Sequence, residues 1–341
     1  MADGASDHTQ SRVTIRTVAT DAGVSVAAVS KVMRNAYGVS DALRQKVEAS
    51  IEKLGYRPSV AARGMRGRTF TLGVLLVGID NPFLPGIYQG IESVTEAAGY
   101  KIMVCVGAAR AQTEAQLIEQ MIDNRMDGLI LVASQIAGDT LEHYARQIPI
   151  VVVGHHETSA VGYDTINNDD QRGAAKVVQA FVDQGYRDIA FLTQFEPDDH
   201  PADVSPQREL GYLDAMRAAG LADHIRILRL PQSNAPREQD FHQLLTSPDR
   251  PRAVFCWSDL DAIPLLGAAF RLGIRVPQDL AIVGYDNSPV AALPMVALSS
   301  VDQDGPHLGR LSAEALFSRM NGRKVAEHIQ IEPRLIKRGS L

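Results

Sequence analysis

The chain has 341 residues, of which 45% are hydrophobic and 22% are charged, and its formal net charge at pH 7 is −6. This length predicts more than one domain, and the composition is ordinary for a globular protein. No apolar run reaches the roughly 18 residues of a membrane span, and the polar N-terminus lacks the apolar segment of a secretory signal. We therefore expect a cytoplasmic protein without membrane contact, in which residues 1–11 form a disordered tail.

Charge is divided unevenly along the chain. Residues 1–69 hold 11 Lys and Arg against 6 Asp and Glu, a net charge of +5, whereas the remaining 23 basic and 34 acidic residues give −11. A basic segment joined to an acidic body indicates a polyanionic partner for the basic segment alone.

The two cysteines lie in apolar, strand-like runs. Buried free thiols are therefore predicted for Cys105 and Cys256, rather than a disulfide or a metal pair. The histidines are scattered, and no group of Cys and His has the spacing of a zinc site. We accordingly predict no bound metal and no cofactor.

The segment from Thr14 to Met33 predicts two short helices joined by a tight turn. Apolar residues recur at helical spacing before Gly23, which suits a helix end, and Thr14 and Ser25 suit the two N-caps. Four residues of the second helix are predicted to face outward near its start: Val26, Ala27, Ser30 and Lys31. A small apolar tip followed by a basic residue suits the major groove of DNA, although an ordinary helical hairpin would have the same pattern.

A third amphipathic helix follows, with Ser40 as its cap, and three such helices can bury one small core over residues 12–57. Residues 58–69 then form a basic joint with room for a single helical turn. One turn is marginal in water, and Gly64 weakens it by about 1 kcal/mol relative to alanine. We expect this joint to be disordered in the free protein and to fold on DNA.

The order of helix-turn-helix, third helix, LGYRP and AAR resembles the head of the LacI/GalR family of bacterial transcription regulators. The resemblance implies a hinge helix that enters the minor groove, where the family inserts a leucine between base pairs. This chain has Met65 at that position, preceded by Gly64 rather than serine, which predicts a looser hinge with an acceptable wedge. The residues expected to contact DNA are Thr14, Ser25, Val26, Ala27, Ser30, Lys31, Tyr37, Arg63 and Met65.

From Thr71 onward, short apolar runs alternate with helical patterns, which predicts an α/β fold with parallel sheets covered on both faces. The predicted strands are 71–78, 100–107, 127–133 and 149–154 in a first set, and 187–193, 224–230, 252–257 and 280–286 in a second. Two similar sets match a two-lobed body of the type I periplasmic-binding-protein kind.

The family resemblance implies how the chain crosses between the two lobes. It places lobe 1 at about 70–167 and 304–322, and lobe 2 at about 168–303 and 323–341, so that the last strand finishes in lobe 2. No leucine heptad follows that strand, and a homodimer is therefore expected rather than a tetramer.

Ligands of parallel α/β sheets bind beyond the carboxyl ends of the strands. Arg208 begins an Arg-x-x-Gly-Tyr run and Asp286 ends VGYD, and both resemble effector-binding motifs of the family, as does NPF at 81–83. The predicted effector-binding residues are Asn81, Phe83, Ser134, Arg208, Trp257, Ser258, Asp259 and Asp286. They supply acceptors, donors and an aromatic face, as a hydroxyl-rich ligand requires. Three of them have a plainer alternative: Trp257 caps the core, Phe83 packs a lid, and Arg208 forms a surface salt bridge.

Two departures from the family pattern leave the identity of the ligand open. Ser258-Asp259 stands where the family commonly has Asn-Asp, and Asn168-Asp169 stands where it commonly has Asp-Asn. The leading hypothesis is a dimeric transcription regulator, a repressor of a palindromic operator, that is controlled by a sugar or sugar derivative. A nucleoside or purine effector, or a solute-binding protein of a transport system, are the alternatives. An enzyme is disfavoured because the chain has no nucleophile elbow, P-loop or dinucleotide-binding glycine motif.

Overall fold

The computed structural model describes residues 13–33, 36–57, 67–194, 203–230 and 237–341. The chain divides into two compact units, Met1–Thr69 and Phe70–Leu341, here called the head and the body and described separately. The predicted N-terminal tail and the hinge residues Arg63, Gly64 and Met65 lie outside the described residues.

The head contains three helices: α1 (Ile15–Asp21), α2 (Val26–Met33) and α3 (Asp41–Leu54). Thr14 and Thr17 bond reciprocally at the start of α1, and the turn into α2 passes through Gly23, whose φ of +60° favours glycine. Val18, Val29 and Val47, one from each helix, are fully buried in the shared core. The sequence therefore folds here as a helix-turn-helix closed by a third helix.

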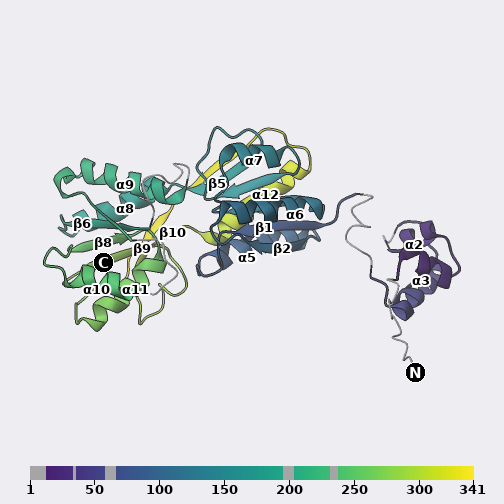
Figure 1. The fold of residues 1–341 in the computed structure, drawn as a ribbon, viewed down its shortest axis with the longest axis horizontal. Helices are drawn as coiled ribbons and strands as arrows, with labels where there is room; N and C mark the ends of the chain where they lie inside the picture. Colours follow the sequence, from purple (N-terminus) through teal and green to yellow (C-terminus); the bar gives the residue numbers. More distant parts are fainter. Residues whose placement is uncertain (1–12, 34–35, 58–66, 195–202, 231–236) are drawn as a thin grey trace, which may run out of the picture. The chain divides into compact units, whose positions relative to one another are not determined.

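The first lobe of the body is built on a parallel sheet with the strand order β11-β5-β4-β3-β1-β2 (Figure 1). Its strands are β1 (Thr71–Leu76), β2 (Lys101–Val106), β3 (Gly128–Val132), β4 (Ile150–Val153), β5 (Asp164–Asn168) and β11 (His328–Ile331). Its helices are α5 (Leu84–Ala97), α6 (Ala111–Asp123), α7 (Gly138–Ala145) and α12 (Gly305–Met320).

The second lobe has a sheet with the order β12-β10-β9-β8-β6-β7, in which β12 runs antiparallel to β10. Its strands are β6 (Ile189–Thr193), β7 (Arg226–Arg229), β8 (Ala253–Cys256), β9 (Ala281–Asp286), β10 (Ser299–Asp302) and β12 (Arg334–Ile336). Its helices are α8 (Asp170–Asp183), α9 (Val204–Ala218), the short 3-10 helix η1 (Ala222–His224), α10 (Glu238–Thr246) and α11 (Asp259–Arg271). The predicted α/β class is confirmed, and all eight predicted strands are present.

The chain crosses between the lobes after β5, after β10 and between β11 and β12. The third crossing corrects the predicted boundary at 322–323, because β11 still belongs to lobe 1, where it pairs in parallel with β5. The sequence reads as one strand, but Pro333 has no N–H to donate to a ladder, and the strand is divided there into β11 and β12.

Helices α12 and α5 of lobe 1 pack in close contact although they are far apart in sequence (Figure 1). A Cβ on Gly309 would stand 1.9 Å from the carbonyl oxygen of Ile87, and one on Gly90 would stand 2.1 Å from that of Pro306. Only glycine allows this approach. Because α5 begins directly after Phe83, the contact also holds the loop that carries Asn81 and Phe83.

The prediction that the strands of the body are covered on both faces is wrong for β2. This strand lies at the edge of its sheet, and Met103 and Val104 are 47% and 43% exposed, with Val106 at 36%. Cys105 on this strand is only partly buried, whereas Cys256 in β8 is fully buried, and both are free thiols. Met103 and Val104 are consecutive and point to opposite faces of the sheet, so neither face of this edge strand is fully covered.

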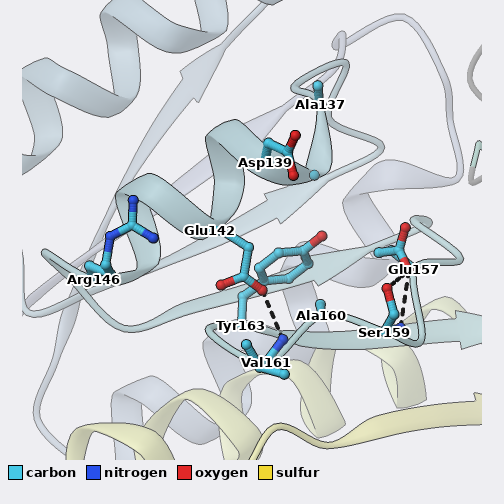
Figure 2. Close-up of a pocket in the computed structure, with 10 residues that line it drawn as sticks. Ala137, Asp139, Glu142, Arg146, Glu157, Ser159, Ala160, Val161 and Tyr163 are labelled. Atoms are coloured by element: carbon cyan, nitrogen blue, oxygen red, sulfur yellow. Dashed lines mark hydrogen bonds between the residues drawn. The ribbon is translucent and has the colours of Figure 1, made fainter.

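Lobe 1 also has a cavity of about 460 Å³ that is open to solvent beside α7, lined in part by Gly138, Glu142 and Tyr163 (Figure 2). No helix within the described ranges is both long and apolar enough to cross a membrane.

Candidate functional site

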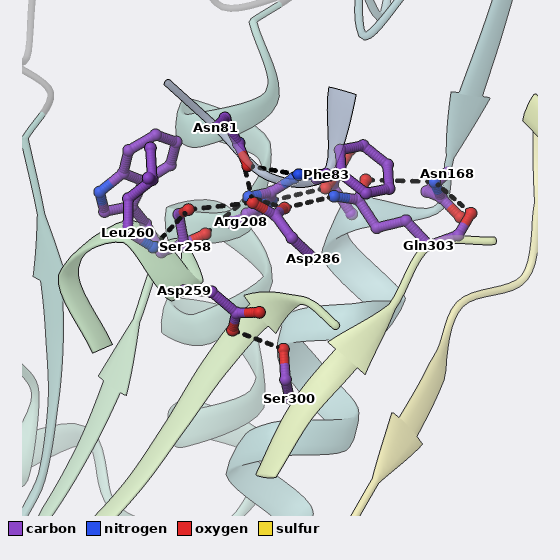
Figure 3. Close-up of polar contacts among 12 residues, drawn as sticks. Asn81, Phe83, Asn168, Arg208, Ser258, Asp259, Leu260, Asp286, Ser300 and Gln303 are labelled. Carbon is purple, nitrogen blue, oxygen red and sulfur yellow. Dashed lines mark hydrogen bonds and ion pairs between the residues drawn. The ribbon is translucent and has the colours of Figure 1, made fainter. Parts of the chain in front are cut away.

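Asp286, at the end of β9, is the centre of a polar cluster that joins the two lobes (Figure 3). Its carboxylate accepts hydrogen bonds from Asn81 Nδ2 of lobe 1 at 3.0 Å, from Ser258 Oγ at 3.0 Å and from Gln303 Nε2 at 2.6 Å. Its side chain is 4% exposed, and its backbone has a φ of 106°, which is strained for a residue with a side chain. Such strain is concentrated at functional sites, and this one aims the carboxylate at the junction of the lobes.

Arg208, in the first part of α9, is held by the protein on three sides. Its Nε donates to Asp170 Oδ1 at 2.7 Å, and its Nη1 donates to the carbonyl oxygen of Trp257 at 2.6 Å. The guanidinium carbon lies 3.7 Å from the ring centre of Tyr285, and Nη1 is 3.9 Å from Asp286 Oδ1. The side chain is 3% exposed, so the surface salt bridge considered above is replaced by a buried pair.

Asp170 is the partner of Arg208 that sequence reasoning missed. It is the first residue of α8, it is 1% exposed, and its second oxygen lies 2.8 Å from His156 Nε2. Burial would raise the pKa of Asp170, but the positive charge of Arg208 and the bond to His156 outweigh it and leave the pKa lowered. The available signal was its place at a helix N-terminus directly after a strand, where a negative charge is stabilised.

Asp259 lies behind Asp286 and braces the second lobe from inside. Its carboxylate accepts bonds from Ser300 Oγ and from the backbone N–H of Ser288, both at 2.7 Å. Burial, followed by the negative charge of Asp286, raises the pKa of Asp259 to about 7. Burial also raises the pKa of Asp286 although Arg208 opposes it. Asp259 and Asp286 are therefore two neighbouring carboxyls buried in one region of low polarity. The bonds of Asp259 orient β9 and β10, and its carboxylate does not face a ligand.

The two predicted aromatic residues are half-buried at the margins of the lobe cores. Trp257 donates its indole N–H to Asp261 Oδ2 at 2.6 Å, and the backbone N–H of Phe83 donates to Asn81 Oδ1 at 2.9 Å. Each ring thus packs on the core and still has an exposed part.

Ser134 is not joined to the cluster by any bond among the described residues. Its hydroxyl donates at 2.8 Å to Glu114 Oε2, which also accepts the backbone N–H of Gln135. Sequence reasoning also missed Gln303, which follows β10, bonds Asp286 and is contacted by Asn168 Nδ2 at 3.2 Å. A glutamine in a loop has no sequence signal for this role.

Of the four residues of α2 predicted to face outward, Ala27 and Lys31 are exposed, whereas Val26 is half-buried against the core and Ser30 is buried. Tyr37, also assigned to DNA, is exposed. Ser30 is only 8% exposed, because it lies on the side of α2 where Val26 already packs against the core. Two more predicted DNA contacts cap helices: Thr14 Oγ1 accepts the N–H of Thr17, and Ser25 Oγ accepts the N–H of Ala28.

Residues 14–59 match the family model of bacterial regulatory proteins of the lacI family, and residues 178–341 match that of a periplasmic binding protein-like domain. The HTH-type transcriptional repressor PurR of Photorhabdus laumondii is 31% identical over 337 residues, which cover 96% of each chain. The ribose operon repressor of Escherichia coli K12 is also 31% identical, over 96% of this chain and 99% of that protein. The chain belongs to the LacI family.

Solved structures agree with this assignment. A complex of the transcriptional regulator CelR with cellobiose is 26% identical, covers 97% of this chain and 100% of its own, and has a TM-score of 0.69. The lac repressor dimer bound to operator and an anti-inducer is 23% identical with a TM-score of 0.81 over 97% of this chain and 99% of its own, which shows the shared fold. This LacI-family protein is a DNA-binding transcriptional repressor with an effector-binding body, as the two repressors named above indicate.

Proposed function

We propose that this repressor acts in the cytoplasm as a homodimer that binds a palindromic operator through its two heads. The exposed apolar edge of lobe 1 supports a second copy, since monomeric proteins seldom leave such side chains uncovered on an unpaired strand. A two-fold symmetric dimer reads two half-sites of opposite orientation, which makes a palindrome the expected operator. Ala27 and Lys31 are the exposed residues of α2 assigned to base edges and phosphates.

The effector is a sugar or sugar derivative that binds at the junction of the lobes and changes operator affinity. The observation that carries this proposal is the Asp286 carboxylate, which takes hydrogen bonds from lobe 1 and lobe 2 at once. A diol can replace such donors, because two vicinal hydroxyls can donate to one carboxylate. A ligand that bonds both lobes together stabilises one lobe arrangement over the other, which is how binding is coupled to the heads.

The residues of the proposed site have different tasks. Asp286 accepts the ligand's hydroxyls, Asn81 and Ser258 donate to it, and Arg208 supplies positive charge from beneath. The exposed parts of Phe83 and Trp257 supply the apolar face. Asp259 and Ser134 act behind this set, since their described bonds are to their own lobe.

A nucleoside or purine is the second candidate, because PurR repressors are among the relatives at 31% identity. Two half-exposed aromatic rings beside a carboxylate suit a base as well as a sugar ring. The two classes are separated by which compound raises the melting temperature of the full-length protein.

A thermal-shift screen over sugars and nucleosides tests the effector class. A ligand at one hundred times its dissociation constant stabilises the folded state by about 2.7 kcal/mol, which is readily measured as a rise in melting temperature. A compound that stabilises the wild type and not Asp286→Asn supports the site. Stabilisation by purines alone would overturn the sugar proposal, and equal stabilisation of the variant would overturn the placement of the site.

A further inference from the structure

The cavity beside α7 lies in lobe 1 and shares no residue with the Asp286 cluster (Figure 2). It has a volume of about 460 Å³, which is within the range of small-molecule sites. Its charged lining residues are Asp139, Glu142, Glu157 and Arg146, a formal net charge of −2. Neither Asp139 nor Glu142 forms an ion pair with another described residue. Among those residues, the negative charges of these two carboxylates are therefore not paired with a cationic side chain.

The carboxylate of Glu142 is fixed in place by the backbone. Its Oε1 accepts the N–H groups of Val161 at 2.8 Å and Gly162 at 3.0 Å. A Cβ on Gly162 would stand 2.3 Å from Glu142 Oε2, so the carboxylate occupies the space that a side chain would need. Glu157 is oriented in a similar way, because its Oε1 accepts hydrogen bonds from the backbone N–H of Ser159 at 3.0 Å and from the hydroxyl of Ser159 at 2.6 Å.

Tyr163 provides an independent sign that the cavity takes a ligand. The residue is fully buried, it lines the cavity, and its hydroxyl has no hydrogen-bond partner among the described residues. Buried hydroxyls are nearly always paired, and an unpaired one costs stability. Burial and the charges of Glu157, Glu142 and Asp139 raise the pKa of Tyr163, which keeps the phenol neutral and its oxygen available as an acceptor.

Gly138 lies close to this hydroxyl. A Cβ at that position would lie 3.4 Å from the Tyr163 oxygen and 4.0 Å from Cγ of Glu157. These are ordinary contact distances, so an alanine would fit the folded protein. Its methyl group would lie against the Tyr163 hydroxyl. The position is therefore a means to block the cavity without disturbing its walls.

We propose that this cavity binds a small organic dication of the aliphatic diamine class. One ammonium group donates a hydrogen bond to the Tyr163 hydroxyl, and the positive charges of the diamine are attracted to Glu142 and its acidic neighbours. The net charge of −2 is complementary to two ammonium groups, and Ala137, Ala160 and Val161 provide apolar surface for the methylene chain. A metal ion fits less well, because the described residues form no group of three His, Cys, Asp or Glu side chains placed to hold one.

The test is calorimetric titration of the full-length protein at low salt with putrescine, the four-carbon diamine. Butylamine, with a single ammonium group, and magnesium chloride at matched ionic strength are the comparison titrants. Putrescine should bind at least about tenfold more tightly than butylamine, because the second charge is lost in the monoamine. Equal or tighter binding of magnesium would overturn the proposal in favour of an inorganic cation.

Three variants locate the binding. Glu142→Gln keeps an oxygen for the two backbone N–H groups and removes the charge, and it should weaken putrescine binding about tenfold or more. Tyr163→Phe should weaken binding by roughly threefold to tenfold while leaving the melting temperature unchanged or raised, since it removes an unpaired buried hydroxyl. Gly138→Ala should abolish binding in a protein that melts as the wild type does.

Glu96→Gln is the matched control, because Glu96 is an exposed carboxylate of the same lobe on α5. It removes the same charge and should leave putrescine affinity unchanged. An equal loss in Glu96→Gln and Glu142→Gln would mean that the diamine only screens surface charge. No heat of binding with putrescine, or wild-type affinity in Gly138→Ala, would also overturn the proposal.

Discussion

Replacing Arg208 by methionine should destabilise the body as well as the effector site. The substitution leaves Asp170, 1% exposed, without the cation that it bonds at 2.7 Å. Removing one partner of a buried ion pair costs about 3–5 kcal/mol, because the other charge stays buried and uncompensated. Domains are stable by about 5–15 kcal/mol, so this loss is a large share of the total. Urea unfolding followed by circular dichroism measures it.

A second substitution tests whether the uncompensated charge is the cause. Asp170→Asn added to Arg208→Met removes that charge, and we expect the double variant to regain about half of the lost free energy or more, since neutral replacements of whole buried pairs cost little. In Arg208→Met alone, burial without the guanidinium should raise the pKa of Asp170. That variant should therefore gain more stability than the wild type as the pH falls through the raised value, because the lowered pKa of Asp170 in the wild type gives that residue no such contribution.

Arg217→Met on the same helix is the control for this experiment. Arg217 and Asp214 form an ion pair whose side chains are 55% and 61% exposed, and exposed pairs contribute about 0–1 kcal/mol. A cost below about 1 kcal/mol for Arg208→Met, or a double variant as unstable as the sum of the two single ones, would refute the account of a buried pair.

Three further predictions concern the pH response, the effector site and the head. Because the pKa of Asp259 is raised to about 7, this carboxyl keeps its proton in the folded protein and loses it in the unfolded chain between about pH 4 and 7. The melting temperature of the protein should therefore fall as the pH rises through that window, and Asp259→Asn should flatten this fall. Asp286→Asn should reduce effector affinity by about tenfold to a hundredfold in calorimetry, while operator binding without effector stays unchanged in a mobility-shift assay. Lys31→Ala should weaken operator binding and reduce its salt dependence by about one unit of log–log slope, whereas Lys337→Ala on the body should change neither.

The parts of the fold that were predicted from sequence are those with strong apolar patterns. Strands β5 and β10 were missed because DTINN and SSVD look polar, yet every residue of β5 is buried. Asp164 in β5 is stable there because Arg319 Nε donates to it at 2.7 Å and the N–H of Glu327 donates at 2.9 Å. These donors follow more than 150 residues later, in segments that only the folded chain brings near β5.

The same limit applies to the candidate site. Asn81, Ser258 and Asp286 were predicted because each lies at or after the carboxyl end of a strand, and these ends gather at one edge of a parallel sheet. Asp170 and Gln303 also lie at such ends, but their importance comes from the side chains that they contact, Arg208 and Asp286. Ser30 was assigned to the wrong face, since its burial depends on how closely α2 packs in the head.

The contacts of Asp286 also indicate what an effector must do to act as a switch. A ligand shifts a conformational equilibrium only by its difference in affinity for the two states. In this structure Asn81 already bonds Asp286 across the lobes, and Gln303 and Ser258 also donate to the same carboxylate. A ligand that merely replaced the Asn81 bond with an equal one would leave the balance between lobe arrangements unchanged. The additional free energy has to come from groups that bind the ligand in one arrangement only, and we propose the half-buried Phe83 of lobe 1 and Trp257 of lobe 2 as those groups.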